Sequence, residues 1–112
     1  MFRKKRSVVS LEEMFANNGL NNKSPIAQGL LDLLCILNYN SGECLSVEIN
    51  PYKRPINNEH GRLWDIRKDC PLIEWVFSEF ELKWELYTYQ DCLDSGSRIG
   101  HIDYGGKLYL GQ

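Results

Sequence analysis

The chain of 112 residues has no apolar run long enough to cross a bilayer, which takes about 20 consecutive apolar residues. Its longest apolar stretch, residues 26–37, is interrupted by Gln28 and Asp32. The basic residues 3–6 carry the charge of a signal-peptide start, but residues 7–13 add neither an apolar segment nor a cleavage site. We therefore expect a cytoplasmic protein that does not insert into a membrane.

The sequence also lacks the ligand spacings of a metal site. Its four cysteines, Cys35, Cys44, Cys70 and Cys92, never form a CxxC pair, and no HExxH motif is present. The glycines near the C-terminus do not lie between a strand and a helix, as glycines that bind phosphate do. We expect no metal, no cofactor and four reduced thiols, because disulfides rarely persist in the cytosol.

Composition indicates one globular domain over residues 1–112, with 43% apolar and 25% charged residues. The net charge of −2 hides an asymmetry, because four of the 13 basic residues lie at positions 3–6. The rest of the chain has 9 basic against 15 acidic residues, a net of −6. We expect residues 1–9 to form a flexible basic segment. The acidic body should repel nucleic acid and attract basic proteins.

Two helices are predicted near the start of the chain. Ser10 and Glu13 form a capping box, which predicts a short helix over residues 11–17. Ser24 and Pro25 are typical of a helix start, and leucines at helical spacing follow as far as Leu37. We predict that this second helix extends to about Tyr39.

Strands are predicted where apolar residues alternate with polar ones. Residues 44–49 alternate in this way, and the proline-containing residues 50–61 favour an exposed loop. The stretch 62–81 is ambiguous, because residues 63–66 fit a short strand whereas the spacing of the apolar residues in 71–79 fits a helix. We predict a helix over 71–79.

The C-terminal third reads as a series of hairpins. Residues 82–90 and 98–104 fit strands joined by a turn at 94–97, and Gly105-Gly106 fits a tight two-residue turn before a last strand at 107–110. The predicted fold class is α+β. It has two or three helices on one face of a mostly antiparallel sheet that ends in a three-stranded meander.

Catalytic candidates are few. His101 and Asp103 would lie on the same face of a strand, so the carboxylate could orient the imidazole. Cys92 could pair with His101 across the hairpin, although a Cys near a His is a weak signal. A small enzyme that uses His101 and Asp103 therefore stays an alternative.

The strongest functional signal is a segment in which acids and aromatics are interleaved. Residues 43–94 hold eleven acids against six bases. Aromatic side chains supply contact area, and carboxylates steer a basic partner. We predict a binding surface made of Trp64, Asp65, Asp69, Glu79, Glu81, Trp84, Glu85 and Asp91.

This surface suggests a small inhibitor or immunity-type protein that neutralises a basic partner, such as a nuclease toxin domain. The other alternative is a scaffold or oligomer-forming accessory protein, in which the aromatics contact a second copy. Sequence leaves the oligomeric state open.

Overall fold

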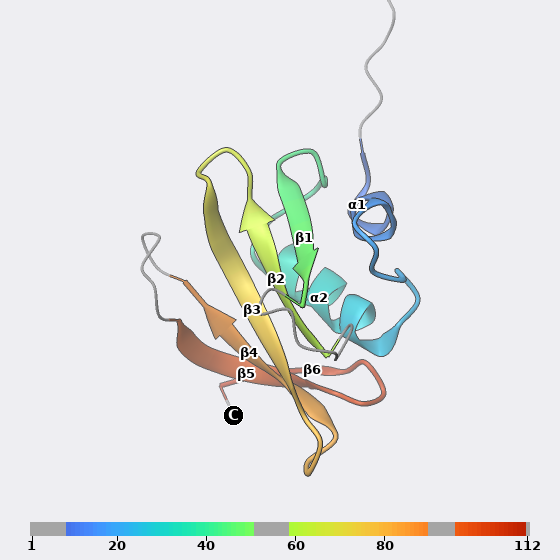
Figure 1. Ribbon diagram of the computed structural model, residues 1–112, viewed down its shortest axis with the longest axis vertical. Helices are drawn as coiled ribbons and strands as arrows, with labels where there is room; N and C mark the ends of the chain where they lie inside the picture. Colours follow the sequence, from blue (N-terminus) through green and yellow to red (C-terminus); the bar gives the residue numbers. More distant parts are fainter. Residues whose placement is uncertain (1–8, 51–58, 90–95, 112) are drawn as a thin grey trace, which may run out of the picture.

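The computed structural model describes residues 9–50, 59–89 and 96–111. Within these residues two helices, α1 (Leu11–Asn17) and α2 (Pro25–Ile36), precede six strands, so the predicted α+β class is confirmed. Figure 1 shows a twisted sheet with α2 behind it and α1 to one side. Of the predicted segments, residues 1–8, most of the loop at 50–61 and the start of the turn at 94–97 lie outside the described residues.

Both helices begin where the sequence predicts. The Ser10 hydroxyl accepts from the Glu13 backbone N–H, and the Glu13 side chain returns to the Ser10 N–H, which completes the capping box. Ser24 caps α2 in the same way by accepting from Ala27. These caps satisfy backbone donors that have no partner inside the helix.

Helix α2 ends at Ile36, earlier than the predicted end near Tyr39. Asn38 adopts a left-handed conformation with φ 67°, and the Tyr39 N–H reaches back to the Leu34 carbonyl at 2.9 Å. This is a Schellman motif, in which asparagine takes the position that glycine usually occupies. No helix in the described part of the chain combines the length and apolar character needed to span a membrane.

The six strands form one sheet in which each strand pairs antiparallel with the next along the chain. They are β1 (Leu45–Ile49), β2 (His60–Asp65), β3 (Cys70–Ser78), β4 (Lys83–Thr88), β5 (Ser97–Asp103) and β6 (Leu108–Leu110). The strands predicted at 44–49, 82–90, 98–104 and 107–110 correspond to β1, β4, β5 and β6.

The helix predicted over 71–79 is wrong, because residues 71–78 belong to β3, the longest of the described strands, and Glu79 begins the turn that follows. The apolar spacing fits a helix, but Ile73, Trp75, Val76 and Phe77 are β-branched or aromatic residues that favour strands. Pro71 lies at a register shift between β2 and β3, a position where a strand tolerates a missing N–H.

The turn between β5 and β6 also differs from the prediction. Its loop has three residues, 104–106, and of its two glycines only Gly106 has a positive φ, of 94°. A three-residue hairpin loop commonly ends in such a left-handed residue, which glycine adopts without steric cost.

One face of the sheet packs against the helices, and we call it the inner face. Its fully buried side chains include Leu63, Ile73, Trp75, Leu86 and Ile102. A Cβ on Gly29 of α2 would lie 2.5 Å from the Ile102 side chain, so glycine lets this helix approach β5 closely. The rest of the core is Met14, Phe15, Leu20, Ile26, Ala27, Leu30, Leu33, Leu34, Leu45, Val47 and Trp84.

Candidate functional site

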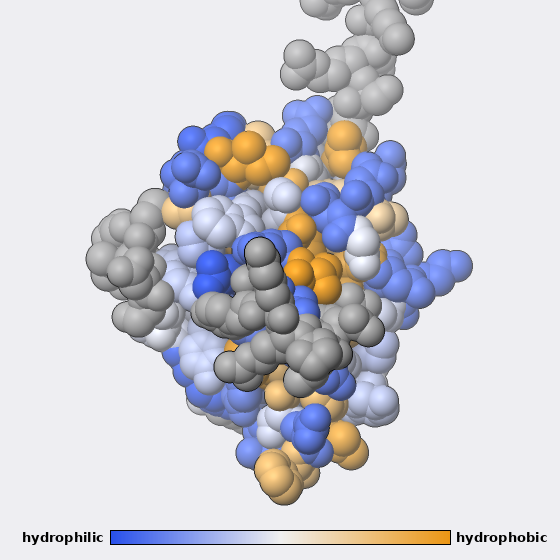
Figure 2. Space-filling model, in the orientation of Figure 1, coloured by the Kyte–Doolittle hydropathy of each residue, from blue (hydrophilic) through white to orange (hydrophobic). Residues whose placement is uncertain are grey.

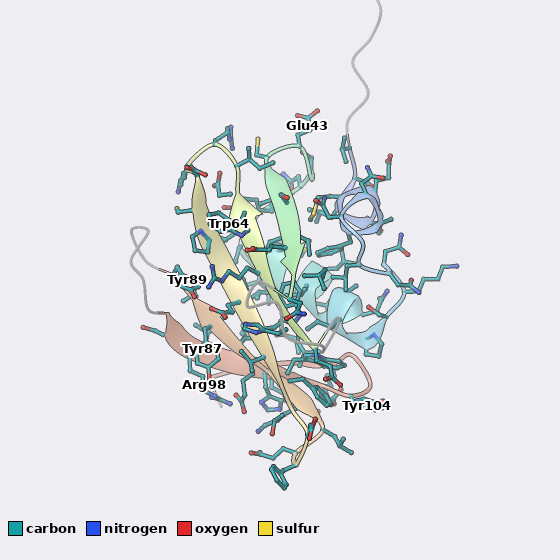
Figure 3. All side chains as sticks on the ribbon, viewed as in Figure 1. Glu43, Trp64, Tyr87, Tyr89, Arg98 and Tyr104 are labelled. Atoms are coloured by element: carbon teal, nitrogen blue, oxygen red, sulfur yellow. The ribbon has the colours of Figure 1, made fainter. Side chains whose placement is uncertain are left out.

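The opposite face of the sheet, which we call the outer face, is polar. Register places one residue from each of five strands in a row across it: Glu48, Arg62, Glu74, Tyr87 and Arg98. Acids and bases alternate along much of this row, and opposite charges in neighbouring strands stabilise a sheet. Figure 3 shows Tyr87 and Arg98 side by side on this face. The outer face can therefore remain ordered without an apolar cover.

Glu74 lies at the centre of this row and is buried. Its carboxylate is 2.5 Å from His60 Nε2 and 3.8 Å from Arg62 Nε, and it accepts a hydrogen bond from the Tyr89 hydroxyl. A buried carboxylate needs such partners, because desolvation of an unpaired charge is costly. These contacts join β2, β3 and Tyr89, the residue that follows β4, which gives Glu74 a structural role.

Glu85 forms a second ion-pair cluster on the outer face. It lies 2.5 Å from Arg98 Nε and 3.4 Å from Lys83 Nζ. Burial disfavours the charged form of Glu85, but Arg98 and then Lys83 outweigh this effect and hold the pKa of Glu85 below its usual value. The negative charge of Glu85 is therefore already balanced by Arg98 and Lys83 of the same chain.

Near the β2–β3 turn, the outer face is hollowed into an open pocket of about 370 Å³, lined by Ser46, Glu48, Trp64, Ile66 and Asp69. The Trp64 indole N–H donates to Glu48 Oε1 at 3.0 Å, so the ring is held in place. Neither Glu48 nor Asp69 belongs to an ion pair within the described residues. Two carboxylates that belong to none of the described ion pairs thus line the pocket together with Trp64. Figure 3 shows Trp64 in the upper part of the sheet.

The turn between β3 and β4, residues 79–82, lies at the lower end of the hairpin in Figure 1. Phe80 is fully exposed at this turn, between the exposed side chains of Glu79 and Glu81. The Glu81 carboxylate also forms an ion pair with Lys83, at 2.9 Å from its Nζ. Figure 2 shows apolar surface at the same end of the molecule. A wholly exposed phenylalanine contributes nothing to the core, so its burial is available to a partner.

The backbone of this turn is strained at Leu82, which has φ 52° although it is not glycine. Its N–H donates to the Ser78 carbonyl at 2.8 Å, and its side chain is 54% exposed. A left-handed conformation costs a β-carbon residue about 1–2 kcal/mol. Burial does not compensate for this cost, and strain of this kind often marks functional sites.

Behind the turn lies an aromatic cluster. The Trp84 ring stacks on Tyr104 with centroids 6.0 Å apart and contacts Phe77 at 5.0 Å. Trp84 is itself buried, and its Nε1 has no hydrogen-bond partner among the described residues. These ring contacts pack β3 and β4 together next to the turn that carries Phe80.

The structure divides the eight predicted site residues into several groups. Trp64 and Asp69 meet in the outer-face pocket, and Glu79 and Glu81 flank Phe80. Asp65 is buried and accepts from the backbone N–H groups of Arg67 and Lys68, which shapes the β2–β3 turn.

The other three predicted residues do not join these groups. Trp84 faces the inner side of the sheet, opposite Trp64, and Glu85 is paired with Arg98. Asp91 lies outside the described residues. The seven predicted residues that the structure describes therefore do not share one face of the sheet.

The catalytic candidates are engaged in other contacts. His101 stacks on Tyr109 with ring centroids 4.8 Å apart, and its Nδ1 has no partner in the described part of the chain. Asp103 accepts from the backbone of Lys107 and Gly105 and from the Tyr109 hydroxyl. The Lys107 N–H is the main cause of a lowered Asp103 pKa. Asp103 thus organises the β5–β6 turn, and Cys92 lies outside the described residues.

The cysteines differ from the prediction. Cys70 is disulfide-bonded, whereas Cys35 and Cys44 are free. The expectation of four reduced thiols is therefore wrong for Cys70. Among the described residues, no three His, Cys, Asp or Glu side chains come together as a group that could hold a metal ion.

Sequence reasoning missed two residues, Phe80 and Leu82. Phe80 continues the apolar spacing of residues 71–79, which favours a helix with Phe80 on its apolar side and not an exposed position. A signal for a turn was present, because Glu79-Phe80-Glu81 separates two runs of strand-forming residues.

No family model, curated protein or solved structure matches the chain.

Proposed function

We propose that this is a small binding protein that neutralises a basic protein partner, in the manner of an inhibitor or immunity protein. The observation that carries the proposal is Phe80, fully exposed between Glu79 and Glu81 at the end of a hairpin. Such a turn can insert an aromatic side chain into an apolar cleft while the Glu79 carboxylate meets a basic residue at the rim.

The chemistry of the turn favours a partner with a positive surface. Carboxylates accelerate association with a basic protein and disfavour acidic competitors. A nuclease toxin is a suitable partner, because a surface that binds nucleic acid must carry positive charge to meet phosphates. Covering that surface would block the toxin.

Leu82 supports the same proposal. A glycine or asparagine at this position would relieve the left-handed strain, yet the chain has an exposed leucine there. A second apolar side chain beside Phe80 enlarges the area that a partner can bury.

The test is photo-cross-linking from position 80, with Phe80 replaced by benzoylphenylalanine. Asp32, exposed on α2, is the matched control position. The first partner to test is the product of a neighbouring gene. We expect a cross-link to a basic protein from position 80 and none from position 32.

Binding of the purified partner then decides the proposal. Phe80→Ala should weaken binding of the partner by about 2 kcal/mol, or about 30-fold in Kd, as expected of a central aromatic anchor. Cross-links only between copies of the chain would support the scaffold alternative instead. An acidic partner, or unchanged affinity of the Phe80→Ala variant, would remove the proposal.

The cytoplasmic location stays a prediction. The disulfide at Cys70 argues against it, because disulfides form and persist mainly in oxidising compartments. Alkylation of the native protein before and after reduction, with mass analysis of the Cys70 peptide, measures the state of this thiol in the cell.

A further inference from the structure

We infer that the outer-face pocket around Trp64 binds one arginine side chain of the basic partner. This inference rests on the proposed function and adds a second contact, separate from Phe80. The pocket supplies an indole face and the carboxylates of Glu48 and Asp69. A guanidinium group matches this combination, because it stacks on aromatic rings and donates several hydrogen bonds to carboxylates.

The pocket is built from neighbouring elements whose positions are fixed by the sheet. Ser46 and Glu48 lie on β1, and Trp64 lies opposite Ser46 on β2. Ile66 and Asp69 belong to the turn that follows β2. The hydrogen bond from Trp64 to Glu48 orients the indole ring. Within the described residues, no basic side chain forms an ion pair with the Glu48 carboxylate.

The charge of the pocket selects a cation. Glu48 and Asp69 are its charged lining residues, whereas Arg67 and Lys68 of the same turn are exposed and do not line it. A neutral or anionic ligand would desolvate two carboxylates without pairing them, which is unfavourable. A cation would pair with them and also meet the negative face of the indole.

The size of the pocket suits a side chain better than a large ligand. Its volume of about 370 Å³ lies near the lower end of small-molecule sites, which span about 300 to 1,000 Å³. It is also open to solvent, so a single arginine derivative should bind weakly. Within an interface the same contact needs no separate loss of translational freedom.

The indole N–H signals of the three tryptophans give a direct assay. Trp75 and Trp84 are buried, so Trp64 is the indole that a ligand in this pocket would touch. A Trp64→Phe variant identifies the Trp64 signal. The probes are N-acetyl-arginine amide, its uncharged analogue N-acetyl-citrulline amide, and N-acetyl-lysine amide.

Charge-neutral variants test the carboxylates without changing shape. Asp69 has φ 52°, a conformation that asparagine tolerates well, so Asp69→Asn should keep the turn intact. Glu48→Gln keeps an acceptor for the indole N–H. Asp32→Asn on α2 is the matched control, because it removes an exposed acid outside the pocket.

We expect arginine amide to shift the Trp64 signal with saturation, and citrulline amide to leave it nearly unchanged. Asp69→Asn and Glu48→Gln should each weaken binding about 2- to 5-fold, as for exposed ion pairs, and Asp32→Asn should not. Lysine amide should bind more weakly than arginine amide.

Three results would overturn the inference: no saturable shift at Trp64, equal binding of citrulline, or equal effects of Asp69→Asn and Asp32→Asn. Lysine binding as tightly as arginine would overturn the guanidinium assignment. Cross-linking from position 80 does not use this pocket. Hence a failed titration with a successful cross-link removes only the arginine site, and the reverse outcome removes the proposed function.

Discussion

The two faces of the sheet are built from the same strands but differ in burial and polarity. On the inner face Leu63, Ile73 and Trp75 are fully buried, whereas on the outer face Arg62 and Glu74 form part of a row of polar side chains. Burial of apolar area supplies most of the free energy of folding, and exposed ion pairs supply little. Exposed charges on the outer face and in the turns can therefore change without loss of the fold, unlike the buried Glu74 and Asp65.

The two proposed contacts lie at opposite ends of β3. The Trp64 pocket borders the turn before this strand, and Phe80 lies in the turn after it. Nine residues of strand span about 30 Å at about 3.3 Å per residue. A roughly circular interface of about 800 Å² per partner, which is the standard size, has a diameter close to this length. One basic partner could thus contact both.

The largest expected effect belongs to the inner side. Leu34→Ala should destabilise the protein by about 2–5 kcal/mol, because Leu34 is fully buried in α2 and its loss leaves a cavity. Urea unfolding measures the change. A cost below about 1 kcal/mol would show that the core does not depend on α2 and would remove the contrast between the faces.

The second prediction separates Asp65 from the acids proposed for binding. Asp65→Ala should cost about 1–3 kcal/mol, because two backbone N–H groups in the β2–β3 turn lose their acceptor. Thermal unfolding of this variant beside Asp69→Asn is the test, because asparagine tolerates the φ of 52° at position 69. Equal stability of the two variants would contradict a structural role for Asp65.

Local signals predicted much of the fold. The capping box at Ser10 and the Ser24-Pro25 start fix the two helices, because capping depends on residues three positions apart. The error at 71–79 has a different origin. Val76 and Phe80 fit helical spacing, but pairing of β3 with β2 and β4 decides its conformation, and this pairing depends on residues far away in the chain.

The candidate site was only partly predictable. Charge and aromatic content pointed to residues 43–94, and Trp64 and Asp69 do meet in one pocket. Sequence could not tell that Asp65 is buried or that Trp84 faces the inner side, because both facts depend on the phase of a strand relative to the core.

The third prediction concerns the strained turn. Leu82→Asn should stabilise the protein by about 0.5–1 kcal/mol, because asparagine tolerates the left-handed conformation at φ 52°. Chemical unfolding gives the change, and Leu110→Asn is a control at another exposed leucine. The variant should bind the partner more weakly if Leu82 contributes contact area. A destabilised Leu82→Asn would show that Leu82 supports the fold.

The fourth prediction is an acid-dependent loss of stability on the outer face. The lowered pKa of Glu85 means that the folded state holds this carboxylate ionised more firmly than the unfolded chain does. Its contribution is therefore present above the ordinary glutamate pKa and is lost as the pH falls through the folded-state value. Arg98→Met should lower stability at pH 7 by up to about 1 kcal/mol and have less effect at pH 3. Melting curves across pH 3–7 measure this difference, and an equal effect at both ends would rule out the ion pair as its cause.

The smallest effect on stability is expected at the β3–β4 turn, where the effect on binding should be large. Glu79→Lys reverses an exposed charge beside Phe80, so the free energy of unfolding should change by less than about 0.5 kcal/mol. Association with a basic partner should slow, and the difference from the unmodified protein should shrink as salt rises, because exposed charges are screened beyond about 8–10 Å at about 0.1–0.15 M salt. Dissociation should change less, since a rim charge acts mainly during encounter. Stopped-flow association rates over a salt series, with Glu12→Lys on α1 as the matched reversal, measure both effects. If Glu12→Lys slows association as much as Glu79→Lys does, then the net charge of the protein attracts the partner, and the β3–β4 turn has no special role in association.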